Sequence, residues 1–232
     1  MKKTLIFQWF DCKDPIREQE LVDCATHNIK LGFDEVVIFN DSVKPIFDGP
    51  QVKNIITQKR ITYKNYIDYV ADPENYGGLF VLTNTDIMLD KRILEVDKSI
   101  KENTLFALSR HEINGALPDM PACTQDVWVM ISQPIHQSVI HQSDIPLGMP
   151  GCETRFSEII FNIGFAVFNP CLEIKNIHIH SKGSTHSEAN RIYGAYLFTP
   201  ACTYEDIESG NPNILPIPHY LTSFTNRLFN IR

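Results

Sequence analysis

The sequence predicts an α/β fold, with one large domain built on a mixed, mostly parallel central sheet that is flanked by helices. Two observations carry this prediction. Apolar strand-like runs alternate with helical patterns through the first half of the 232 residues, which is typical of parallel sheets. In addition, polar clusters follow three of the predicted strands, at Asp11, Asn40-Asp41 and Asn84-Thr85-Asp86. Since ligands of such sheets bind outside the carboxyl ends of the strands, we expect a site there.

The first half contains four expected strands and two expected helices. A helix begins after Asp14, a good N-cap, with Pro15 at its first position, and Gly32 ends it. A second helix covers 62–70, where aromatic and apolar residues recur at helical spacing. The expected strands, which are apolar runs bounded by polar residues, are 3–10, 35–40, 51–58 and 78–83.

The second half is more mixed. We expect a helix over 153–162 and a loop over the proline-containing stretch 133–150. After Pro200 the sequence shows little periodicity, and we expect this tail to wrap the surface or contact a partner. The expected strands are 105–108, 127–131, 165–169 and 174–180. The domain is therefore assigned to 1–195, and 196–232 to a C-terminal extension that packs on the domain or on a partner.

Composition limits the possible functions. The net charge of −7 argues against a nucleic-acid partner, because phosphate backbones need a clustered basic surface. No apolar run reaches the length of a membrane span, and the stretch after Met1 is too short for a signal peptide. The six cysteines are scattered without a CxxC pair, which predicts reduced thiols and a cytoplasmic protein.

Three side chains are candidates to bind a metal. Asp86 follows a buried strand, and an amide oxygen from Asn84 on the same side would suit Mg²⁺ or Mn²⁺. On a strand, His178 and His180 share one face and could bind one ion, because imidazole is a common metal ligand. The structural alternatives are a turn aspartate and two polar residues on an edge strand.

Two acidic and several basic residues complete the candidate set. Glu153 begins a helix after a glycine-containing loop, where it could take a proton or simply complement the helix dipole. Asp126 is a second candidate, or else a turn residue at a strand start. Lys182 and Arg191 flank the histidine pair and could hold a diphosphate. Neither GxxxxGK[ST] nor GxGxxG occurs, which excludes these two phosphate-binding motifs.

Taken in order, these segments resemble the nucleotide-sugar-dependent glycosyltransferases of GT-A fold. They are most similar to a small viral and bacterial set that includes the chlorovirus capsid-glycan rhamnosyltransferase domain. The matching segments are KRITYKNY (59–66), VLTNTDIMLD (81–90), ALSRHE (107–112), TQDVWVM (124–130), GMPGCETRFSEIIFNIGFAVFNP (148–170) and IKNIHIHSKGS (174–184).

The resemblance implies a role for each candidate. Asp86 would bind Mn²⁺ or Mg²⁺ that bridges the donor diphosphate, with His180 or else His178 as a further ligand. Glu153 would be the base that deprotonates the acceptor hydroxyl in an inverting reaction, and Asp126 would face the acceptor. The remaining residues implied to contact the donor nucleotide or its diphosphate are Trp9, Phe10, Asp11, Asp41, Arg60, Tyr63, Asn84, Thr85, Lys182 and Arg191.

Two positions depart from the family's pattern. Asn84 replaces the first acidic residue of the Asp-x-Asp metal motif, and Glu153-Thr154 stands where Asp-Asn is expected. We expect a metal-dependent glycosyltransferase that moves a sugar from a nucleotide-activated donor, with UDP-sugar as the first candidate, to a glycan hydroxyl. A metal-dependent phosphohydrolase, a nucleotidyltransferase and a non-catalytic carbohydrate-binding module of the same fold are the alternatives. The sequence leaves the oligomeric state open.

Overall fold

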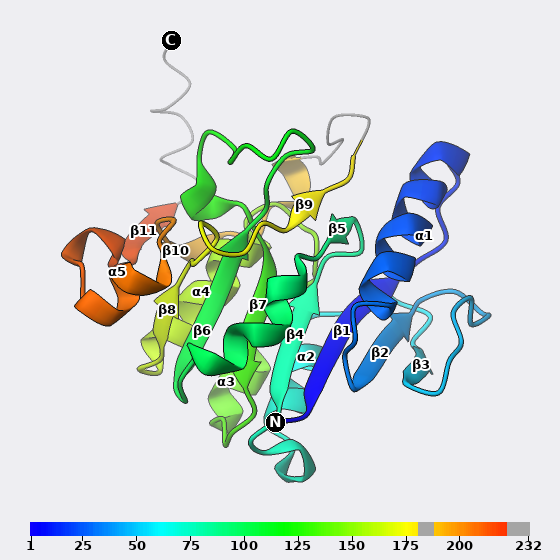
Figure 1. The fold of residues 1–232 in the computed structure, drawn as a ribbon, viewed down its shortest axis with the longest axis horizontal. Helices are drawn as coiled ribbons and strands as arrows, with labels where there is room; N and C mark the ends of the chain where they lie inside the picture. Colours follow the sequence, from blue (N-terminus) through cyan, green and yellow to red (C-terminus); the bar gives the residue numbers. More distant parts are fainter. Residues whose placement is uncertain (181–187, 222–232) are drawn as a thin grey trace.

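A central sheet of seven strands, in the order β3-β2-β1-β4-β7-β6-β8, organises the part of the chain that this computed structural model describes, residues 1–180 and 188–221 (Figure 1). Four of its neighbouring pairs are parallel, and β7 is antiparallel to both β4 and β6. The strands of this sheet are β1 (Lys3–Trp9), β2 (Glu35–Asn40), β3 (Val52–Ile56), β4 (Leu79–Thr83), β6 (Thr104–Ser109), β7 (Gln125–Ile131) and β8 (Ala166–Phe168).

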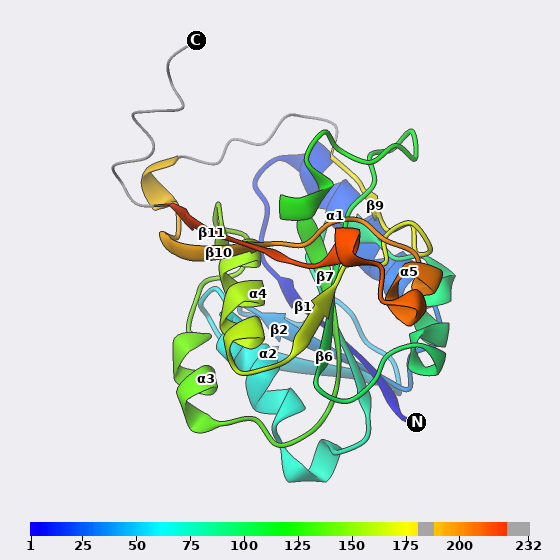
Figure 2. The same cartoon turned by 90° about the vertical axis from the view of Figure 1, so that its left-hand side faces the viewer.

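Helices cover both faces of the sheet, as Figures 1 and 2 show from two sides. The α-helices are α1 (Pro15–Ile29), α2 (Tyr63–Val70), α3 (Gln137–Gln142), α4 (Cys152–Asn162) and α5 (Tyr204–Ser209). The short 3₁₀ helices are η1 (Pro73–Asn75), η2 (Lys91–Lys98), η3 (Pro121–Cys123), η4 (Glu188–Asn190) and η5 (Pro212–Ile214).

The two hydrophobic layers follow from the alternation of side chains along each strand. Within β4, Phe80 and Leu82 pack with α2, α3 and α4, whereas Leu79 and Val81 pack with α1 and η2. Each strand therefore contributes to both cores, which explains the almost uninterrupted apolar runs that predicted these strands.

The carboxyl ends of β1, β2, β4 and β6 lie at one edge of the sheet, because these strands run in the same direction. The antiparallel strand β7 starts at this edge, with Gln125 and Asp126. A short antiparallel ladder, β5 (Ile87–Met88) with β9 (Ile177–His178), lies beyond it (Figure 1). A second ladder, β10 (Gly194–Phe198) with β11 (Ile217–Leu221), packs on α4 through β10.

The predicted fold class is confirmed: the chain forms an α/β domain with a mixed, mostly parallel sheet between helices. Two local predictions are wrong. The stretch 133–150 is not all loop, since it contains α3. The expected strand 174–180 is reduced to two residues, Ile177–His178. The chain after Pro200, where the sequence shows little periodicity, contains α5, η5 and β11.

Two further observations concern the whole described chain. None of the six cysteines forms a disulfide, as predicted. No helix among residues 1–180 and 188–221 combines the length and apolar character needed to cross a bilayer. The division at 195/196 stays a prediction, and β10 runs across that position.

Candidate active site

The β5–β9 ladder brings Asp86 and the two histidines together. Ile87 pairs with His178 and Met88 with Ile177, and the amide of Ile179 donates to the carbonyl of Asp86 at 2.9 Å. On its other side, the amide of His178 donates to the carbonyl of His111 at 2.8 Å. Backbone hydrogen bonds thus fix the register that places these side chains, even though the strand is far shorter than expected.

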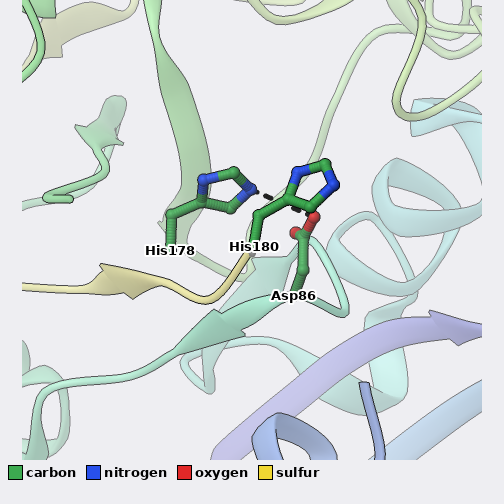
Figure 3. A group of neighbouring side chains, drawn as sticks. All are labelled: Asp86, His178 and His180. Atoms are coloured by element: carbon green, nitrogen blue, oxygen red, sulfur yellow. Dashed lines mark hydrogen bonds and ion pairs between the residues drawn. The ribbon is translucent and has the colours of Figure 1, made fainter. Parts of the chain in front are cut away.

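Asp86, His178 and His180 point toward one another, as Figure 3 shows. One potential ligand atom from each of the three lies within 4.8 Å of the others. Nε2 of His178 is 3.2 Å from Oδ2 of Asp86, and the two imidazole centroids are 5.4 Å apart. Two imidazole nitrogens and one carboxylate oxygen are a donor set that fits Mn²⁺ or another first-row transition ion, whereas Mg²⁺ prefers oxygen ligands.

Arg17, in the first turns of α1, is the main ion-pair partner of Asp86. Its Nη2 donates to Oδ2 of Asp86, and its Nη1 donates to the Ile179 carbonyl at 2.6 Å and to Glu20 at 2.9 Å. Burial alone would raise the pKa of Asp86, but the hydrogen bond and charge of His178, together with Arg17, hold that pKa below its usual value. Asp86 is therefore ionised at neutral pH.

The pKa of His180 is lowered, first by burial and then by the charges of Arg17 and His178. A neutral imidazole is the form that binds metals, so this shift favours a role as ligand.

Helix α1 also fixes the β5–β9 ladder, through hydrogen bonds of Asn28. Nδ2 of Asn28 donates to the carbonyl of Ile87 at 2.7 Å, and Oδ1 of Asn28 accepts from the amide of Leu89 at 2.9 Å.

Asp126 lies next to this group and has both carboxylate oxygens occupied. Oδ1 accepts from Nδ2 of Asn84, and Oδ2 accepts from Nη1 of Arg110 at 3.0 Å. Burial raises the pKa of Asp126 more than the charge of Arg110 lowers it, and the charge of Asp86 raises it further. Asn84 therefore serves here as the amide that connects the end of β4 to Asp126 on β7.

Glu153 stands in the first turn of α4, behind Gly151, whose φ of +80° lets the loop turn into the helix. Its Oε2 is buried and has no hydrogen-bond partner. Burial raises the pKa of Glu153 to about 7, against an opposing backbone hydrogen bond and with a further contribution from the charge of Asp126. A carboxylate poised near neutrality can accept or donate a proton at working pH.

Arg191, from the segment before β10, acts on two side chains, Tyr196 and Cys123, that also feel the charge of Glu153. It hydrogen-bonds Tyr196, whose pKa is raised by burial and lowered in part by this contact. Burial and the charge of Glu153 raise the pKa of Cys123, and the charge of Arg191 opposes them. The backbone before β10 lies close to the loop before α4, because a Cβ on Gly151 would come within 3.0 Å of the Ile192 carbonyl oxygen. Arg191 and Glu153 therefore share neighbouring side chains at the start of α4.

A third group collects at the ends of β1 and β2. Burial raises the pKa of Asp41, the hydrogen bond from Gln8 at 3.0 Å lowers it, and the charges of Asp11 and Arg60 act on it with opposite signs. Arg60 is exposed, and its Nη1 donates to the carbonyl of Leu147 at 2.8 Å. Phe10 is partly buried beside this group.

Two of the predicted nucleotide contacts are corrected by the structure. Trp9 is 1% exposed and packs edge-on against Phe47, and Tyr63 is 0% exposed and stacks on Phe156. Both side chains belong to the hydrophobic cores and leave no surface for a nucleotide. Thr85 is also buried, and its hydroxyl donates to the carbonyl of Gln8, so it ties the β4 loop to β1. Lys182 lies outside the described residues.

Sequence reasoning missed two arginines, Arg17 and Arg110. Both follow the carboxyl end of a strand at the site edge, Arg17 in the helix after β1 and Arg110 directly after β6. Their place after a strand was the available signal. Their pairing with Asp86 and Asp126 depends on how α1 and β6 sit against β4 and β7, which periodicity does not give.

Comparisons with known proteins complete the description. No protein-family model matches the chain, and no curated protein matches it. Among solved structures, a candidate nucleotide-diphospho-sugar transferase from Desulfovibrio desulfuricans G20 is similar, with a TM-score of 0.48 and 10% identity over 72% of this chain and 79% of that one. A candidate glucose-1-phosphate thymidylyltransferase from Bacillus anthracis, in complex with sucrose, has a TM-score of 0.43 and 12% identity over 72% and 86%. Because both TM-scores are below 0.5, the functional proposal rests on the side chains of this chain.

Proposed function

We propose that the protein is a glycosyltransferase that moves a sugar from a nucleotide-activated donor, with UDP-sugar as the first candidate, to a hydroxyl of a glycan acceptor. The observation that carries this proposal is the combination of two unlike carboxylate sites at one sheet edge. One joins Asp86 with two imidazoles, and the other holds Glu153 with its buried Oε2 unpartnered and its pKa raised by burial to about 7. The resemblance in sequence supports the same function.

The first site suits the leaving group. As the glycosidic C–O bond to phosphate breaks, its electron pair passes to the diphosphate, whose growing charge needs cationic partners. A divalent ion such as Mn²⁺, held by Asp86, His178 and His180, would supply Lewis-acid stabilisation there. Arg60, Lys182 and Arg191 are the proposed further phosphate contacts, and Asp11 and Asp41 the proposed nucleoside contacts.

The second site suits the acceptor. In an inverting reaction, Oε2 of Glu153 takes the proton from the acceptor hydroxyl while the hydroxyl oxygen attacks the sugar carbon. In a retaining reaction, Glu153 instead orients the acceptor. Asp126 would lie at the edge of the acceptor site. Because both of its oxygens accept hydrogen bonds, from Asn84 and Arg110, Asp126 does not itself take up the proton.

The test begins with calorimetric titration of UDP, GDP and dTDP into the protein with and without Mn²⁺, for the wild type and Asp86→Ala. Metal-dependent binding of one nucleotide that is lost in the variant is the expected result. Sugar release from the matching nucleotide sugar is then followed with and without glycan acceptors. Turnover that needs no acceptor would indicate a phosphohydrolase. Release of pyrophosphate from a nucleoside triphosphate would indicate a nucleotidyltransferase. Glycan binding that does not depend on nucleotide or metal would indicate a binding module.

A further inference from the structure

Arg17 occupies the coordination space of Asp86. Its Nη2 donates a hydrogen bond to Oδ2 of Asp86, the same oxygen that lies 3.2 Å from Nε2 of His178. The side chains of Arg17 and Asp86 are each 19% exposed, so the pair is largely shielded from water. An ion bound by Asp86, His178 and His180 would have to share this carboxylate with a guanidinium.

Such sharing is unfavourable, because a divalent ion and a guanidinium repel each other across the few ångströms that one carboxylate spans, and the partly buried setting screens this repulsion weakly. Metal binding is therefore weakened as long as Arg17 keeps its hydrogen bond to Asp86. The other bonds of Arg17, from Nη1 to Glu20 and to the Ile179 carbonyl, keep the side chain at the rim of the site.

A diphosphate is the natural new partner for the released guanidinium. Arginine binds phosphate oxygens through two parallel N–H donors, and the Nη2 group freed from Asp86 offers such donors beside the metal ligands. The donor diphosphate would thus also accept a hydrogen bond from Arg17, whose guanidinium would exchange the carboxylate of Asp86 for a phosphate.

We propose that Arg17 competes with a divalent ion for Asp86, and that the donor diphosphate relieves this competition by taking over the guanidinium. Metal and nucleotide then bind cooperatively, and by linkage each raises the affinity for the other by the same factor. The second half of this inference rests on the proposed function, whereas the competition itself concerns only the residues around Asp86.

The decisive experiment measures Mn²⁺ binding to the metal-free protein by the electron paramagnetic resonance signal of free Mn²⁺. The proteins are the wild type, Arg17→Gln, Arg17→Lys and the control Arg92→Gln. Arg92 forms a comparable ion pair with Asp90, outside the group of Asp86, His178 and His180. Without nucleotide, Arg17→Gln is expected to bind Mn²⁺ about 5-fold more tightly than the wild type, as expected when a competing ion pair is removed. Arg17→Lys should lie between them, and Arg92→Gln should match the wild type.

The same titrations are repeated with UDP, GDP and dTDP, corrected for the Mn²⁺ that each nucleotide binds in solution. The nucleotide should tighten Mn²⁺ binding in the wild type and lose most of this effect in Arg17→Gln. Equal or weaker Mn²⁺ binding by Arg17→Gln without nucleotide would overturn the competition, as would no Mn²⁺ binding by any of the proteins at millimolar concentration.

The proposed function fails on different results. If no nucleotide binds and no sugar is transferred, the glycosyltransferase proposal is lost, while the titrations with Mn²⁺ alone still decide the competition. If sugar is transferred but Arg17→Gln behaves like the wild type in every Mn²⁺ titration, the function stands and the role of Arg17 is refuted.

Discussion

Asp86 and Glu153 lie at the same edge of the sheet, and their surroundings move their pKa values in opposite directions. Asp86 is partly buried but bonded to Arg17 and His178, so its pKa is lowered. Glu153 is also partly buried, but its Oε2 is buried without a hydrogen-bond partner, so burial and the nearby charge of Asp126 raise its pKa to about 7. Partners, and not burial alone, decide whether a carboxylate here is a permanent anion or a proton carrier.

The largest expected effect comes from removing the proton carrier. Glu153→Gln should lower the transfer rate by about 10²–10⁴-fold, because a general base is lost, and leave nucleotide binding unchanged. In the wild type, kcat/KM should rise with pH up to about 7 and then level off, since Glu153 acts in its ionised form. Rates with saturating acceptor and a pH series for both proteins check this.

Glu158→Gln is the matched control, because Glu158 lies on the same helix but is paired with Arg155 and Asn162. Its pH profile should keep the midpoint of the wild type. A Glu153→Gln enzyme that retains half of the wild-type rate would assign the base to another residue.

Next comes the permanent anion. Asp86→Asn keeps the shape but removes the charge, so it should abolish Mn²⁺ binding and lower transfer by about 10²–10³-fold through poorer stabilisation of the leaving group. Asp90→Asn is the control, since Asp90 also has a lowered pKa and pairs with Arg92, and asparagine can keep its helix cap. Unchanged Mn²⁺ affinity in Asp86→Asn would exclude Asp86 as a ligand.

The difference between the two carboxylates should also appear in stability. The pKa of Glu153 is about 7 in the folded state and near the ordinary glutamate value when unfolded, so the unfolded chain loses this proton first as pH rises. The resulting loss in the free energy of unfolding is absent below the pKa of the unfolded state. It grows as the pH rises from that value to the folded pKa of about 7, and it is complete above about 7. Above that pH, Glu153→Gln should exceed the wild type by about 3 kcal/mol in the free energy of unfolding.

Urea unfolding at pH 4 and pH 8.5 measures this effect. Glu158→Gln should change stability with the opposite sign at pH 8.5, since it removes a partner of Arg155. If Glu153→Gln stabilises the protein equally at both pH values, its effect does not come from ionisation.

The smallest effect concerns the residue between the two sites. Asn84→Asp would place a second carboxylate against Asp126 and remove the donor to its Oδ1, which should cost about 1–3 kcal/mol of stability. Asn84→Ala removes the donor alone, so the difference between the two variants isolates the repulsion. Tighter Mn²⁺ binding by Asn84→Asp at unchanged stability would instead make position 84 a metal ligand.

The fold was largely predictable because inner strands such as β2 and β4 pack on both faces and are almost entirely apolar, whereas the edge strand β3 carries Lys53 and Asn54 and has no fully buried residue. The errors have local causes. Helix α3 has two buried apolar residues, Val139 and Ile140, between proline-containing segments, which is too short a pattern to detect. The segment around β9 pairs for two residues only, although its alternation suggested a longer strand.

At the site, the resemblance grouped Asp86 with His178 and His180, and the structure places these side chains close together, but the arginines that pair with the acids were not predicted. Tyr63 is instructive. Its spacing with Tyr66, Ile67 and Val70 predicted one buried helical face, and all four are 0% exposed. The resemblance assigned Tyr63 to a nucleotide, and here the periodicity was the better guide, because it reflects packing directly.

The β5–β9 ladder has a consequence for how this chemistry could change. His178 belongs to a two-residue pairing outside the seven-stranded sheet, His180 follows that pairing by two residues, and Asp86 precedes its other strand. Neither hydrophobic core contains the two histidines. The side chains of the segment 177–180 could therefore be redesigned to bind other metals, or none, while the two hydrophobic cores stay intact.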